Sequence, residues 1–356
     1  MRVIEPANRE IVEGRVRPSR SSLDVPRKGR PTLRAPIKRT LEKVLRAVDL
    51  LIAPFVFCCA VLLKFVRRAG IGRLPHSRAM LLRAGCFPVL DHYYEPAFHN
   101  EPLRELLSTH RDLPGISWNG DEQLQLLASF SYNDELASVS RQERGIHEFY
   151  MDNGAFGSGD AEYWYNLIRF KKPKQIIEVG SGFSTRMARR ALAANEREDP
   201  QYSCEHILIE PYEHEWLEEL GIAVIREKVE NCDMRMFEKL GADDILFIDS
   251  SHIIRPRGDV LFEYLELLPT LNVGVIVHIH DIFSPRDYPA EWIIDKVRFW
   301  NEQYLLEAFL TSNREWKIIG ALNYLQHHDY EQLNAKCPFL TPDREPGSFY
   351  IQKVGV

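Results

Sequence analysis

From about residue 174 onward, short apolar runs alternate with longer segments of helical periodicity, and this alternation constrains the fold more than any other feature. The runs are continuously apolar, as expected for parallel strands that helices cover on both faces. The predicted strands are 175–179, 206–209, 222–225, 244–248, 273–279, 316–322 and 348–353, and the predicted helices are 185–197, 261–271 and 291–310. Such a series predicts a three-layer, doubly wound, Rossmann-like α/β sheet whose ligands bind beyond the carboxyl ends of the strands.

A glycine-rich turn, EVGSGFST at 178–185, ends the first predicted strand and opens the first predicted helix. Gly180 and Gly182 permit a tight turn and a close approach of the backbone to a ligand, and the helix start offers free N–H groups. Ser184 stands where the dinucleotide fingerprint has its third glycine. Glu210 closes the next strand, where a carboxylate accepts hydrogen bonds from ribose hydroxyls. These residues predict a site for a nucleoside-containing cofactor.

Over roughly residues 150–356, the sequence resembles the class I S-adenosylmethionine-dependent methyltransferases. EVGSGFST resembles their first motif, HILIEPY their second strand with its ribose-binding acid, and DILFIDSSH and GVIVHIHDIF the ends of their fourth and fifth strands. The closest resemblance is to a bacterial subgroup that is linked with glycan or secondary-metabolite O-methylation. The resemblance implies a methyltransferase sheet with an N-terminal helical extension and S-adenosylmethionine as the cofactor. The cofactor-binding residues that it implies are Glu178, Gly180, Ser181, Gly182, Ser184, Glu210 and Asp249, with Asp233 as the candidate for the adenine contact.

Acidic residues end the fourth and fifth predicted strands, and each has a histidine near it. Asp249 precedes His252 in the sequence DSSH, and His280 directly precedes Asp281. In the family's strand order these strands are neighbours, about 4.8 Å apart, so we expect both carboxylates at adjacent strand tips. One alternative is a Mg²⁺ ion held by Asp249 and Asp281. The other is metal-free general-base catalysis by His252 or His280. Either way, we predict that these four residues form the catalytic centre.

Charge and apolarity set the N-terminal part of the chain apart. Residues 1–70 carry 16 Lys and Arg against 6 Asp and Glu, and the remainder carries 29 against 45. The acidic remainder argues against nucleic-acid binding, which needs a cationic surface. The apolar run 50–63 covers about 21 Å, short of the ~30 Å hydrocarbon core of a bilayer. The segment around it is therefore an interfacial helix on an anionic membrane, a full span or a buried core helix.

The predicted organisation follows from these patterns. It consists of a disordered basic arm (1–36), an apolar helix with membrane affinity (37–70), a helical and loop subdomain (71–150) and a methyltransferase domain (151–356). The six cysteines form no CxxC pair, which excludes a zinc ribbon and favours a reducing, cytoplasmic setting. If the apolar helix binds lipid, the protein lies on the inner face of the cytoplasmic membrane.

The sequence therefore predicts an enzyme that transfers a methyl group from S-adenosylmethionine to a hydroxyl of a small-molecule or saccharide acceptor. Two other functions stay open. One is a nicotinamide-dependent oxidoreductase on a similar sheet, and the other is a non-catalytic scaffold that is recruited to a membrane. The sequence leaves the oligomeric state undetermined.

Overall fold

The computed structural model describes residues 35–90, 95–96, 103–212 and 215–355. The chain divides into two compact units, one up to Pro88 and one from Val89 onward. The predicted disordered arm lies outside the described residues, except for its last two. The predicted boundaries at 70/71 and 150/151 do not coincide with this division. No division falls at 150/151, because Leu127 and Leu136 pack in the same core as residues of the sheet.

The first unit consists of α1 (Ala35–Ala69) and α2 (Pro75–Ala84), with one turn of 3₁₀ helix between them. The predicted helix over 37–70 is therefore confirmed. Most of its apolar side chains are exposed, with Leu51 at 80% and Phe55 at 72%. Residues Leu41–Ala69 are long and apolar enough to cross a membrane, judged by length and composition. Within the described residues, none of the most apolar 18-residue window of this helix is buried.

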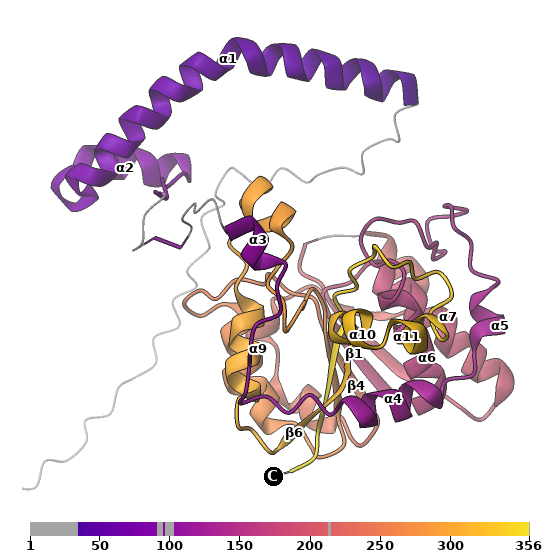
Figure 1. Cartoon of the computed structure of the whole chain (residues 1–356). Coiled ribbons are helices and arrows are strands. Elements are labelled where there is room, and N and C mark those ends of the chain that lie inside the picture. Colours follow the sequence, from indigo (N-terminus) through magenta and orange to yellow (C-terminus); the bar gives the residue numbers. More distant parts are fainter. Residues whose placement is uncertain (1–34, 91–94, 97–102, 213–214, 356) are drawn as a thin grey trace, which may run out of the picture. The chain divides into compact units, whose positions relative to one another are not determined.

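The second unit contains one seven-stranded sheet in the order β3-β2-β1-β4-β5-β7-β6 (Figure 1). The strands are β1 (Gln175–Val179), β2 (Glu205–Ile209), β3 (Ala223–Ile225), β4 (Ile245–Ile248), β5 (Ile276–Ile279), β6 (Trp316–Ala321) and β7 (Phe349–Lys353). Every predicted strand is confirmed to within three residues at each end. The first five strands pair in parallel, whereas β7 is antiparallel to β5 and β6. The sheet is therefore mixed. Strand β7 lies between β5 and β6 and runs antiparallel to both.

Alternate residues of the strands enter two separate cores. In β4, Ile245 and Phe247 belong to one core, and Leu246 and Ile248 belong to the other. Six helices contribute residues to the first core: α4 (Gly120–Ala128), α5 (Asn133–Leu136), α6 (Asp160–Lys171), α7 (Phe183–Glu198), α10 (Leu322–His328) and α11 (Tyr330–Asn334). Two helices contribute residues to the second core: α8 (Asp259–Phe262) and α9 (Glu302–Leu310). A short helix, α3 (Leu103–Leu107), precedes α4. Because helices cover both faces of the sheet, its polar chemistry is confined to the ends of the strands.

The predicted continuous helix over 291–310 is wrong. A π-helical turn (Glu291–Asp295) is followed by irregular chain, and α9 begins only at Glu302. The N–H groups of Asn301 and Glu302 donate to the carbonyl oxygen of His252, at 2.9 and 3.2 Å, instead of to the preceding turn. Long-range backbone bonds thus replace helical ones, which periodicity alone does not reveal.

Candidate active site

The turn between β1 and α7 requires a glycine at position 180. Gly180 has a φ of 81°, and a Cβ there would lie 2.1 Å from the carbonyl oxygen of Asp249. A residue with a side chain would meet both strain and a clash with backbone. The tip of β1 consequently lies directly against the tip of β4, which brings Asp249 beside the glycine turn.

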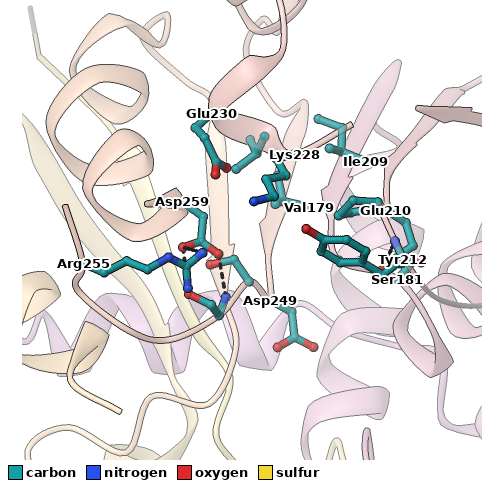
Figure 2. A pocket seen from close by; sticks show the side chains of 15 residues that line it. Val179, Ser181, Ile209, Glu210, Tyr212, Lys228, Glu230, Asp249, Arg255 and Asp259 are labelled. Atoms are coloured by element: carbon teal, nitrogen blue, oxygen red, sulfur yellow. Dashed lines mark hydrogen bonds and ion pairs between the residues drawn. The ribbon is translucent and has the colours of Figure 1, made fainter. Parts of the chain in front are cut away.

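A cavity of about 550 Å³ opens at the carboxyl ends of β1, β2, β3 and β4 (Figure 2). It is lined by Val179, Gly180, Ser181, Ile209, Glu210, Pro211, Tyr212, Lys228, Val229, Glu230, Asp249, Ser250, Ser251, Arg255 and Asp259. Its size and its place above the strand tips suit a nucleoside-containing cofactor. Glu210 is largely buried, and its carboxylate accepts hydrogen bonds from the Ser181 hydroxyl (3.3 Å) and the Tyr212 N–H (3.0 Å).

Four of the predicted cofactor residues line this cavity, namely Gly180, Ser181, Glu210 and Asp249. The remaining three, Glu178, Gly182 and Ser184, are not among its lining residues. Asp233 does not line it either, since this exposed carboxylate pairs with Arg235.

Glu178 is fully buried on the side of α7, away from the cavity lining. One of its carboxylate oxygens accepts from the hydroxyls of Ser184 (3.1 Å) and Thr185 (2.9 Å), and the other lies 2.7 Å from Nε2 of His206. Glu178 thus links β1, β2 and the first turn of α7. Its contacts hold the glycine turn in place.

Several lining residues are not evident from the sequence. Lys228, Val229 and Glu230 follow β3 and line the cavity. Their only sequence signal is their position after the third strand, which has three residues and is only partly buried. Arg255 and Asp259 also line the cavity and form an ion pair at 3.2 Å. The sequence of the loop after β4 does not show whether Arg255 lines a cavity or lies in solvent.

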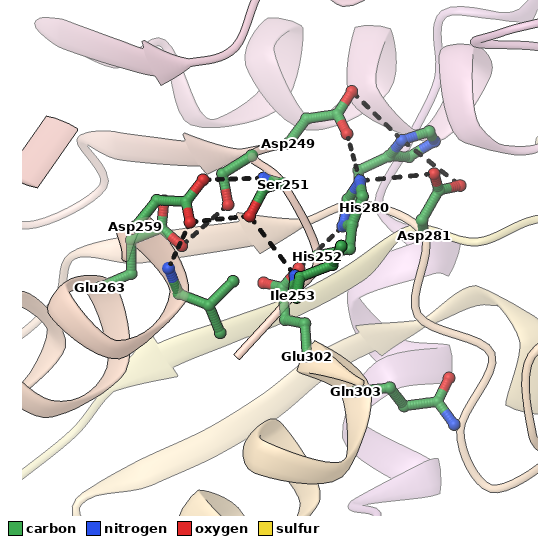
Figure 3. A network of polar contacts seen from close by, with 12 residues as sticks. Asp249, Ser251, His252, Ile253, Asp259, Glu263, His280, Asp281, Glu302 and Gln303 are labelled. Atoms are coloured by element: carbon green, nitrogen blue, oxygen red, sulfur yellow. Dashed lines mark hydrogen bonds and ion pairs between the residues drawn. The ribbon is translucent and has the colours of Figure 1, made fainter. Parts of the chain in front are cut away.

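The four predicted catalytic residues come together beside the cavity, at the tips of β4 and β5 (Figure 3). Nε2 of His252 lies 3.1 Å from Oδ1 of Asp249 and 3.7 Å from Oδ2 of Asp281. Nδ1 of His280 lies 3.5 Å from Oδ2 of Asp249 and 3.7 Å from Oδ1 of Asp281. Each carboxylate therefore faces both imidazoles. We call these four residues the strand-tip cluster.

Glu302, at the start of α9, is a fifth member of this network that the sequence analysis missed. It is fully buried, and its Oε2 lies 2.8 Å from Nδ1 of His252, while its Oε1 accepts from the Tyr264 hydroxyl at 3.0 Å. This contact orients His252 so that Nε2 faces Asp249 and Asp281. Glu302 lies 50 residues from His252 along the chain. Glu302 reaches His252 because α9 begins at this residue, after the irregular chain that follows Asp295.

Backbone conformation marks the same two strand tips. His252 and Asp281 have φ values of 59° and 60°, in the left-handed region that residues with side chains rarely adopt. Such conformations persist where the surrounding structure enforces them, and they concentrate at functional sites. Both residues face the centre of the cluster.

The electrostatics of the strand-tip cluster follow from burial and from the alternation of acids and imidazoles. Burial alone would raise the pKa of Asp249, but His280 and His252 outweigh it and hold that pKa well below its usual value. Burial raises the pKa of Asp281. Burial also opposes protonation of His280, yet Asp281 and Asp249 raise the pKa of this imidazole to about 9. The pKa of His252 is likewise raised, against burial, by Asp249 and Glu302. Positive charge between the two carboxylates is therefore favoured.

Three of the four residues also fit a metal ion. One ligand atom each from Asp249, His280 and Asp281 lies within 4.8 Å of the others. Nδ1 of His280 is buried and has no hydrogen-bond partner among the described residues. An unpartnered imidazole nitrogen that faces two carboxylates is a suitable donor set for a divalent cation.

Comparisons with known proteins give a family for this part of the chain. A family model described as "Methyltransferase domain" matches residues 177–282, which span β1 to the end of β5 and include all four residues of the strand-tip cluster. An uncharacterized protein of Archaeoglobus fulgidus is 30% identical over 165 residues, which cover 42% of this chain and 72% of that protein.

Solved structures of methyltransferases align with this chain at low identity and low TM-score. An O-methyltransferase from Bacillus cereus, in complex with SAH, is 12% identical and aligns over 66% of this chain and 91% of its own, with a TM-score of 0.33. The O-methyltransferase TomG from Streptomyces achromogenes, involved in tomaymycin synthesis and in complex with SAM, is 14% identical and aligns over 67% and 97%, with a TM-score of 0.35.

The family assignment rests on the matched family model and on the arrangement of the chain that it covers. The residues that the family model matches carry the glycine turn, Glu210 and the strand tips, and the sheet has helices on both faces, as predicted for the methyltransferase fold. This excludes a nicotinamide-dependent oxidoreductase. The chain belongs to the class I S-adenosylmethionine-dependent methyltransferases, and it is an enzyme of that class.

Proposed function

We propose that this enzyme transfers the methyl group of S-adenosylmethionine to a hydroxyl oxygen of a small-molecule or saccharide acceptor. The observation that carries the proposal is the strand-tip cluster beside the cofactor cavity. Asp249 belongs to both, since it lines the cavity and faces both imidazoles of the cluster. A methyl donor in the cavity and an acceptor at the cluster would therefore meet at Asp249.

The donor would be held by the residues that line the cavity. Glu210 would accept hydrogen bonds from the ribose hydroxyls, and the close approach at Gly180 and Ser181 would admit the methionine part. The chain after β3, at Val229, would lie beside the adenine. The sulfonium already activates the methyl group, so the protein's main contribution is to align the acceptor oxygen at about 3 Å from the methyl carbon.

In the reaction, the acceptor oxygen forms a bond to the methyl carbon while the carbon–sulfur bond breaks and its electron pair passes to sulfur. The hydroxyl proton leaves to the strand-tip cluster. In its neutral form, with Nδ1–H donating to Glu302, His252 is placed to receive the proton at Nε2. Asp249 and Asp281 would stabilise the resulting imidazolium.

A divalent cation fits the same cluster, with Asp249 and Asp281 as its carboxylate ligands. Judged by these two carboxylates, the ion would be Mg²⁺. When bound, it would lower the pKa of an acceptor hydroxyl. The cation and the histidine base predict different responses to chelation. Methyl transfer that EDTA abolishes and added metal restores supports the cation. Methyl transfer that EDTA leaves unchanged supports His252 as the base.

The exposed apolar helix α1 supports a second part of the proposal, namely that the protein associates with an anionic membrane surface. Basic residues lie on both sides of the apolar run, among them Lys43 and Arg46 before it and Arg67 and Arg68 after it. Such flanks favour anionic headgroups, and the apolar side chains favour the interface. We propose the cytoplasmic face of the membrane as the location, since six scattered cysteines without a CxxC pair favour a reducing setting.

The test of the methyl-transfer proposal is incorporation of label from methyl-tritiated S-adenosylmethionine into an extract of cells that lack this protein. The product is then identified by mass spectrometry. A methyl ether on a saccharide or other hydroxyl compound supports the proposal. Label on nitrogen or carbon only would contradict it.

A further inference from the structure

We propose that the strand-tip cluster selects a first-row transition-metal ion, such as Mn²⁺ or Co²⁺, over Mg²⁺, because His280 provides a nitrogen ligand between Asp249 and Asp281. The inference rests on the proposed function only in taking this cluster as the cation site. It concerns the identity of the ion, which is measured by binding and does not require an acceptor.

The spacing of the three ligand atoms suits a bridging ion better than direct contact. Nδ1 of His280 lies 3.5 Å from Asp249 and 3.7 Å from Asp281, beyond the usual range of N–H···O hydrogen bonds. Two ligands that each lie about 2.1 Å from one ion are roughly 3 to 4 Å apart. The separations therefore match those of atoms that share a metal.

His280 is also fixed in this orientation. It is 5% exposed, its backbone N–H donates to the carbonyl oxygen of Ile248 at 2.9 Å, and its ring packs on Phe156 with centroids 5.1 Å apart. Nδ1 is buried without a hydrogen-bond partner among the described residues. Its two carboxylate neighbours lie beyond hydrogen-bond distance, so Nδ1 makes no short polar contact. A metal ion between these groups would give the nitrogen and both carboxylates a short contact.

The chemistry of the donor set indicates the class of ion. Mg²⁺ prefers oxygen ligands in an octahedron and keeps several waters, so an imidazole contributes little to its binding. Imidazole binds divalent first-row transition ions well, and two carboxylates with one imidazole favour them over Mg²⁺. His280 stands where a third carboxylate would have produced an all-oxygen site.

The experiment uses the full chain, free of any histidine tag and stripped of metal with EDTA. Calorimetric titrations compare MnCl₂, CoCl₂ and MgCl₂, and pulsed electron paramagnetic resonance of the Mn²⁺ complex detects coupling to a ¹⁴N ligand. We expect Mn²⁺ and Co²⁺ to bind at least about tenfold more tightly than Mg²⁺. We also expect a ¹⁴N coupling from the imidazole of His280.

The variant His280→Asp tests the role of the nitrogen directly. It should lose the ¹⁴N coupling and bring the Co²⁺ and Mg²⁺ affinities closer together, because the site then offers oxygen only. His147→Asn is the matched control, since His147 is a half-exposed histidine outside the cluster, and it should leave both readouts unchanged. His280→Asn serves as a second variant if three carboxylates prevent folding, and S-adenosylmethionine binding reports whether each variant retains the cavity.

Three results would overturn the inference: equal affinities for Mg²⁺ and Co²⁺ in the unmodified chain, a ¹⁴N coupling that survives in His280→Asp, or no metal binding at all. If metal binding is absent while methyl transfer persists, the inference fails and the proposed function stands with His252 as the base. If methyl transfer to oxygen is absent while Co²⁺ binds through His280, the proposed function fails and the metal site stands.

Discussion

Asp249 and Asp281 lie on adjacent strand tips, but they differ in what they touch. Asp249 lines the cofactor cavity and contacts both imidazoles, whereas Asp281 faces the imidazoles and is not among the lining residues. Replacing Asp281 should therefore affect the transfer step more cleanly than the donor site.

We expect Asp281→Asn to lower the rate of methyl transfer by about 10²–10³, because it removes one of the two charges that hold the cluster together. Affinity for S-adenosylmethionine should change by less than about threefold, since the donor is held by other residues. Single-turnover transfer of tritiated methyl measures the rate, and calorimetry measures the affinity. Asp243→Asn, at the opposite end of β4, is the matched control. A near-normal rate in Asp281→Asn would show that this carboxylate is structural.

Gly180→Ala should abolish donor binding and lower the free energy of unfolding by about 2 kcal/mol or more. The reason is the 2.1 Å approach of a Cβ to the carbonyl oxygen of Asp249, together with the positive φ. Thermal unfolding and calorimetry measure the two effects. Gly145→Ala is the control, since a Cβ there has no neighbour within 4 Å. Unchanged stability in Gly180→Ala would mean that β1 and β4 lie farther apart than the structure places them.

The sequence predicts much of the site because glycines and charged residues at strand ends are few. Gly180, Glu210, Asp249 and Asp281 each follow an apolar run, and this position places them at one edge of the sheet. Glu178 shows the limit of this reasoning. Its motif position suggests a ligand contact, but side-chain direction alternates along a strand, and this carboxylate lies on the side of α7.

The first turn of α7 depends on Glu178, which accepts two hydroxyl hydrogen bonds and faces His206. We expect Glu178→Ala to lower the free energy of unfolding by about 2–4 kcal/mol, because it leaves three buried polar groups without their partner. Chemical denaturation measures the effect, with Glu238→Ala, an exposed glutamate on another element, as the control. Loss of donor affinity without loss of stability would contradict this structural role and restore the direct ligand contact.

Strands were more predictable than helices in this chain, and the reason is physical. A strand buried on both faces needs a continuous apolar run, which is visible in the sequence. The segment 291–301 has helical periodicity but departs from helix, because Arg298 lies over the rings of Trp292 and Trp300 and α9 starts on the carbonyl of His252. Those contacts join distant parts of the chain, so Glu302 and its link to His252 could not be predicted.

For the molecule as a whole, we expect the full chain to co-sediment with vesicles that contain anionic lipid. The double variant Leu51→Glu and Phe55→Glu should abolish this, since each charge in an apolar membrane segment costs about 2–3 kcal/mol. Both positions are highly exposed, so folding should be unaffected. Leu265→Glu, at an exposed leucine of the second unit, is the control. Equal sedimentation of the double variant and the unmodified chain would contradict membrane binding through α1.

The account depends most on the identity of the cofactor in the cavity, and calorimetry of donor binding tests it most directly. We predict that the full chain binds S-adenosylmethionine and its demethylated product but not NAD⁺. Glu210→Ala should weaken that binding by about 1–3 kcal/mol, roughly 5- to 150-fold, because the carboxylate no longer accepts from the ribose hydroxyls. Tight binding of NAD⁺ with none of S-adenosylmethionine, or a Glu210→Ala variant that binds the donor as well as the unmodified chain does, would contradict the account.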